Sequence, residues 1–200
     1  MPTATGPTVS SSTARALYSM TRTLAYAETI RLVPPSPGGV SVEGFKRVLA
    51  ELARLGVGRR APSLGRTAGA QDFEKAAEVA LSALEESPVP AAEWRPMSDI
   101  LSDELAGLVG ISASSLARYR SGERITPDPV AARLHVVAMV VSDLSGSYND
   151  FGIRRWFQRP RTALGGRAPG EILSGHWNPD EDEVIRVRDL ARSLLGAAGA

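Results

Sequence analysis

The sequence SDELAGLVGISASSLARYRS, residues 102–121, carries the clearest structural pattern of the chain. A small residue is followed four positions later by a glycine, and apolar residues then return at helical spacing, as Ala106, Gly110, Leu116 and Tyr119. Ser112 is a favourable N-cap for a helix that runs to about Ser121. Two short helices joined by a glycine turn at this spacing are typical of a helix-turn-helix.

The second of these helices offers residues for contact with DNA. A helix-turn-helix presents the first turn of this helix to the major groove, and here that turn holds Ser112, Ala113, Ser114 and Ser115. Three arginines lie on the helix or just past it, namely Arg118, Arg120 and Arg124. They are expected to contact phosphates, and Arg118 is placed to reach a guanine edge. The alternative is a purely structural helix-turn-helix whose arginines form a solvated face.

Further helices are predicted on both sides of this motif. Apolar residues spaced three and four apart predict helices over 13–32, after a Ser41 cap, and over 71–87. No alternation long enough for a strand occurs, so the fold class is expected to be all-α. The expected parts are a disordered tail over 1–12, an N-terminal helical region over 13–95, a helix-turn-helix DNA-binding region over 96–126 and a C-terminal helical domain over 127–200.

The C-terminal domain is predicted to contain several more helices. A helix over 130–144 has an apolar stripe, which is a candidate surface for the homodimer that a reader of DNA half-sites is expected to form. Helices are also expected over 151–158, from Pro169, and from the acidic run 180–183 to Leu195.

Composition and charge narrow the classes of function. Lys+Arg 23 against Asp+Glu 22 gives a formal net charge of +1, so contact with DNA has to come from a local patch. Without cysteine there is no disulfide, thiolate metal site or cysteine nucleophile, and a cytoplasmic location is expected. No stretch approaches the roughly 18 apolar residues of a membrane span.

The sequence also lacks the patterns of an enzyme or a cofactor site. His135 and His176 are the only histidines, and neither has a metal ligand at suitable spacing. No phosphate-binding loop or nucleotide-binding glycine pattern is found. The acids at 180–183 are better explained as a solvated helix start than as paired catalytic carboxylates. We therefore expect a protein that is not an enzyme and that uses no metal or cofactor.

A second motif follows in the C-terminal half. It combines a tryptophan helix, a proline turn, a double-glycine turn and a proline-started helix, made by Trp156, Pro160, Leu164, Gly165, Gly166, Arg167, Pro169, Ile172 and Leu173. Together with the preceding helix-turn-helix, residues 98–196 resemble the Xre-type antitoxins of RES/Xre toxin-antitoxin pairs, the family with an Xre/MbcA/ParS-like toxin-binding domain. The chain departs from the family pattern at Ala168, at Gly170 and in the segment 175–183, and its N-terminal helices lie outside the resemblance.

The resemblance implies an antitoxin with an Xre-like helix-turn-helix that represses its operon, and a C-terminal domain that neutralises a RES-type, NAD-consuming toxin. The candidate toxin-binding residues are Arg155, Arg159, Arg161, Arg167, Trp177, Arg186, Arg188 and Arg192. Deletion of residues 184–200 is then expected to release the toxin and to leave the helix-turn-helix folded. The alternative is a free-standing dimeric helix-turn-helix transcriptional regulator without a toxin partner.

Overall fold

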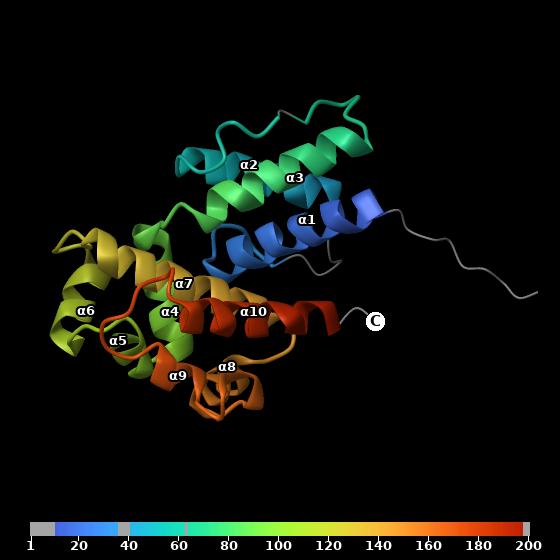
Figure 1. Ribbon diagram of the computed structural model, residues 1–200. Helices are drawn as coiled ribbons and strands as arrows, with labels where there is room; N and C mark the ends of the chain where they lie inside the picture. Colours follow the sequence, from blue (N-terminus) through green and yellow to red (C-terminus); the bar gives the residue numbers. More distant parts are fainter. Residues whose placement is uncertain (1–10, 36–40, 63, 198–200) are drawn as a thin grey trace, which may run out of the picture. The chain divides into compact units, whose positions relative to one another are not determined.

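The computed structural model describes residues 11–35, 41–62 and 64–197, and within these ranges its regular elements are all helices (Figure 1). The all-α class is confirmed. The chain divides into two compact units, one from Met1–Leu24 and Pro35–Ser87, the other from Ala25–Pro34 and Pro88–Ala200. Residues 1–10 of the predicted tail lie outside the described residues, whereas Ser11 and Ser12 already belong to the first helix.

The first unit is built from three helices, α1 Ser11–Thr29 as far as Leu24, α2 Val42–Arg54 and α3 Ala70–Glu85. As predicted, Ser41 caps α2, and its hydroxyl accepts a hydrogen bond from the Gly44 amide at 3.0 Å. α2 and α3 each bury an apolar face, made by Phe45, Val48 and Leu52 and by Ala76, Ala77, Ala80, Leu81 and Leu84. The buried Arg22 of α1 pairs with Glu85 at the end of α3.

The second unit contains the end of α1 and every element from α4 onward. They are α4 Pro90–Leu101, α5 Glu104–Leu108, α6 Ala113–Ser121, α7 Asp128–Ser145, α8 Asp150–Gln158, the 3-10 turn η1 Thr162–Leu164, α9 Pro169–Ile172 and α10 Asp182–Ala197. From residue 112 onward these bounds agree with the predicted helices.

Helix α7 is the core of the second unit. Every residue from 130 to 144 is buried except Ala132, which is half-buried. α10 lies along α7 (Figure 1) and contributes Val184, Val187 and Ala191, all of them fully buried. The apolar stripe of α7 is therefore covered by the unit's own helices. The prediction that this stripe forms a homodimer surface is wrong, because the stripe is not exposed.

Helix α4 was not among the predicted helices. The helix has Pro90 in its first turn and accommodates Pro96 inside it. Trp94, Met97 and Leu101 follow at helical spacing and are buried. The predicted boundary between residues 95 and 96 falls within α4, and α5 and α6 belong to the same compact unit as the C-terminal helices.

Candidate nucleic-acid and partner interfaces

The predicted helix-turn-helix corresponds to α5, a tight turn and α6. Gly110 adopts a φ of 67°, and a Cβ at this position would lie 1.8 Å from the carbonyl oxygen of Gly175. Only glycine fits this turn. Ser112 caps α6 as predicted, and its hydroxyl accepts from the Ser115 amide at 3.2 Å. The helix ends at Gly122, whose φ of 79° is left-handed.

The candidate DNA-contacting residues lie on the outer side of α6. Ala113, Ser114, Arg118 and Arg120 are exposed, and Ser115 is half-buried. Neither Arg118 nor Arg120 forms an ion pair with any residue that the structure describes. The hydroxyl of Ser112 lies 3.0 Å from those of Ser114 and Ser115, so the serines of the first turn bond to one another. Arg118 and Arg120 are thus exposed and without an ion pair in the described part of the chain, whereas the serines of the first turn are already hydrogen-bonded.

The inner side of α6 is held by α4. The Tyr119 ring is buried and stacks on Trp94 with centroids 5.7 Å apart and planes inclined by 19°. The indole of Trp94 donates to the Thr126 hydroxyl at 2.9 Å, just past α6. The Arg124 guanidinium lies 5.7 Å from the centroid of Tyr119, so this arginine is partly engaged by the protein itself. The sequence predicted Tyr119 as an inter-helix contact but missed Trp94.

The end of α5 is tied to the C-terminal helices through its last carbonyl groups. The Leu108 carbonyl accepts from the Trp177 indole at 2.9 Å, and the Val109 carbonyl accepts from the Arg133 guanidinium at 2.8 Å. Burial lowers the pKa of Arg133. The Gly175 amide also donates to Gly107 at 3.4 Å. Carbonyls that a helix end leaves unpaired are therefore satisfied by residues of α7 and of the loop before α10.

This arrangement corrects the prediction for Trp177. The side chain is 3% exposed, and its indole nitrogen is already bonded to Leu108. Trp177 therefore packs inside the second unit and is not available to a toxin in this structure.

The predicted toxin-contacting arginines differ in their exposure and in their partners. Arg167 and Arg186 meet at Glu183, at 2.7 Å and 3.7 Å. Arg192 pairs with Asp189 at 3.7 Å, and Arg188 is half-buried. The remaining three lie on α8 or just after it: Arg155 and Arg159 are exposed, and the half-buried Arg161 lies over the Trp156 ring.

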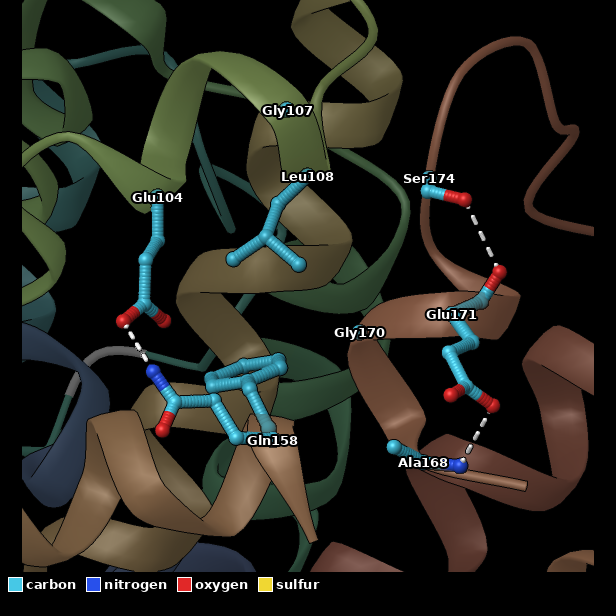
Figure 2. Close-up of a pocket in the computed structure, with 9 residues that line it drawn as sticks. Glu104, Gly107, Leu108, Gln158, Ala168, Gly170, Glu171 and Ser174 are labelled. Atoms are coloured by element: carbon cyan, nitrogen blue, oxygen red, sulfur yellow. Dashed lines mark hydrogen bonds between the residues drawn. The ribbon is translucent and has the colours of Figure 1, made fainter. Parts of the chain in front are cut away.

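A groove that the sequence did not predict opens between α5, α8 and α9 (Figure 2). It has a volume of about 480 Å³, and its apolar lining includes Leu108, Phe157 and Ala168. Glu104 and Glu171 lie on opposite sides (Figure 2). Glu104 accepts from the Gln158 amide at 2.6 Å, and Glu171 accepts from the Ala168 amide at 3.1 Å. The lining residues are far apart in sequence, so no local sequence pattern could predict the groove.

A buried polar cluster joins the end of α1 to α4 and α7. The carboxylate of Glu93 is fully buried, accepts from the Tyr26 hydroxyl and lies 2.6 Å from Nδ1 of His135. Burial, followed by the negative charge of Glu93 and its hydrogen bond, raises the pKa of Tyr26 well above its ordinary value. His135 was predicted to lie inside an apolar helix, and its partners come from elements distant in sequence.

Among the residues that the structure describes, no group of three or more His, Cys, Asp and Glu side chains is arranged to hold a metal ion. Within the same residues, no single helix has the length and apolar composition of a membrane span, although α7 and α8 together, bent by 120°, have both.

Comparison with known proteins adds no relative from which a function can be transferred. No protein-family model, curated protein or solved structure matches the chain.

Proposed function

We propose that this protein is an antitoxin-type regulator, which binds operator DNA through α5 and α6 and neutralises a RES-type NAD-consuming toxin through the C-terminal part of the second unit. The observation that carries the DNA-binding half is the exposure of Arg118 and Arg120 on a capped helix whose opposite side is packed on Trp94. Exposed arginines on a rigid short helix suit phosphate and base-edge contacts. The proposal places the protein in the cytoplasm, with its DNA and its toxin.

The toxin-binding half rests on the resemblance of residues 98–196 and on the exposed arginines of this part of the chain. Arg159 is exposed and has no ion pair among the described residues, and Arg167 and Arg186 share one carboxylate. Arginine binds anionic groups through charge-assisted hydrogen bonds, which suits a pocket that holds the phosphates of NAD. No catalytic role is assigned to the protein in this proposal.

The experiment is co-expression with the RES-type protein encoded next to its gene, with growth and cellular NAD as the measurements. The intact protein should restore both, and a gel shift should show binding to the DNA upstream of its gene. The matched variant Arg159→Glu with Arg167→Glu should lose protection and keep the gel shift. No protection by the intact protein, with binding to the upstream DNA retained, would replace the antitoxin by the free-standing regulator.

A further inference from the structure

We infer that the groove between α5, α8 and α9 and the adjacent outer face of α8 form a self-complementary surface, through which two copies of the chain pair around a two-fold axis. The occupant of the groove is Phe151 of the second copy, accompanied by Arg155. The role of this dimer in reading two DNA half-sites rests on the proposed function. The pairing itself is argued only from the groove and the outer face of α8.

The first half of the surface is the groove. Its apolar lining and its volume of about 480 Å³ suit an aromatic side chain, and Glu104 and Glu171 give its sides negative charge (Figure 2). One oxygen of each carboxylate accepts a hydrogen bond from the protein, from Gln158 and from Ala168. A Cβ built on Gly107 meets no atom within 4 Å, so the α5 side of the groove is open. The groove is therefore suited to bind an apolar group that has a positive charge next to it.

The second half is an exposed aromatic group on α8 that has this property. Phe151 is 61% exposed, the most exposed aromatic side chain among the described residues. The Arg155 guanidinium lies 5.8 Å from the centroid of its ring. Asn149 caps α8 beneath it and accepts from the Gly152 amide at 2.9 Å, so the first turn that carries Phe151 is well fixed. Aromatic residues, phenylalanine among them, and arginine are enriched at protein interfaces, so a fixed Phe151 beside an arginine suits a binding surface.

The two halves are continuous along one helix face. Phe151, Arg155 and Gln158 are at positions i, i+4 and i+7 of α8, so they share one side of it. The phenylalanine and the glutamine of the groove are separated by about 10 Å along the helix axis. Two copies of α8 placed antiparallel around a two-fold axis midway between them would bring each Phe151 to the other copy's Gln158.

The charges of the two copies are also complementary in both directions. Because the Arg155 guanidinium lies over the Phe151 ring, it reaches the partner groove together with that ring, where Glu104 accepts from Gln158. Each copy contributes one aromatic side chain with an arginine beside it and one acidic groove, which is the property of an isologous interface. The pairing also supplies the two-fold symmetry that a helix-turn-helix needs to read two half-sites, and it replaces the α7 stripe, which is buried.

The test is the oligomeric state of the full chain, measured by sedimentation over a range of concentrations without DNA or toxin. The intact chain should form a dimer. Phe151→Ser and Arg155→Glu should each raise its dissociation constant by about tenfold or more. The double variant Glu104→Arg with Glu171→Arg should do the same. An equimolar mixture of this double variant with Arg155→Glu should restore the dimer, since each copy then meets an opposite charge.

Matched controls separate this surface from general effects. Arg95→Glu on α4 and Ile185→Ser on α10 change exposed side chains of the same kinds and should leave the dimer unchanged. If reversing both glutamates disturbs folding, Gly107→Gln provides a second way to fill the groove. A monomeric intact chain, or variants that dimerise like it, would overturn the inference while leaving toxin neutralisation open. Loss of toxin neutralisation with an intact dimer would overturn the proposed function alone.

Discussion

Single residues explain why the turn between α5 and α6 tolerates so little change. Gly110 combines a left-handed φ with a backbone neighbour so close that a methyl group has no room. Gly107, three residues earlier, lies in α5 with open space around its Cβ direction. The two glycines therefore differ in what they contribute, because only Gly110 is required by the turn.

We expect Gly110→Ala to lower the free energy of unfolding by more than about 2 kcal/mol, because the backbone of Gly175 would have to move and the turn would be strained. Gly107→Ala is the matched control and should stabilise the protein by about 0.5–1 kcal/mol, because alanine favours a helix. Urea unfolding of both variants measures the difference. Equal effects of the two substitutions would show that the contact with Gly175 does not constrain the turn.

A second prediction at the residue scale concerns Tyr26. Its pKa is raised by burial and by Glu93, so above pH of about 10 the unfolded chain loses this proton while the folded chain keeps it. The stabilisation is therefore complete below that pH and declines as the pH rises further. Urea unfolding across this range should give a steeper loss of stability for the intact chain than for Tyr26→Phe. Tyr148→Phe, which changes an exposed tyrosine, should leave the slope as it is in the intact chain.

At the scale of helices, local signals in the sequence were sufficient to predict most of the helices. Ser41 and Ser112 cap their helices as predicted, because an N-cap depends only on residues within one turn. Helix α4 escaped prediction because Pro96 is a local helix breaker, and the burial of Trp94 that offsets it comes from tertiary packing. Trp177 was misassigned for the same reason, since the partner of its indole is 69 residues away in sequence.

The final helix shows how tertiary packing changes a prediction. From sequence, removal of residues 184–200 should leave the helix-turn-helix folded. In the structure, α10 covers α7, and α7 provides the arginine that bonds the end of α5. We therefore expect this truncation to unfold the second unit, with loss of helical circular dichroism and of operator binding together.

The substitution Ile185→Ser is the matched control, because this side chain is on the same helix and is 40% exposed. It should retain the helical signal and the cooperative unfolding of the intact chain. A truncated chain that still unfolds cooperatively and still binds the operator would show that α10 is separable, as the sequence alone suggested.

At the scale of the whole molecule, net charge and local charge have to be distinguished. The formal net charge is +1, so the chain as a whole has little attraction for DNA. The structure places Arg118 and Arg120, both exposed, on helix α6. Neither composition nor local pattern could locate the groove on α8, since Glu104, Gln158 and Glu171 come together only on folding.

The last prediction follows from that local charge. If Arg118 and Arg120 each neutralise a phosphate, the logarithm of the operator association constant should fall with the logarithm of salt concentration, and changing both to alanine should reduce that slope by about two. Affinity at low salt should fall as well, because fewer counterions are released. The pair Arg47→Ala with Arg60→Ala removes the same charge from exposed positions of the first unit and should preserve the slope. The slopes come from titrations of labelled operator at several salt concentrations. An unchanged slope in the Arg118 and Arg120 double variant would move the DNA-binding surface away from α6. Removing two charges from α6 would then have no more effect on the slope than removing two charges from the first unit.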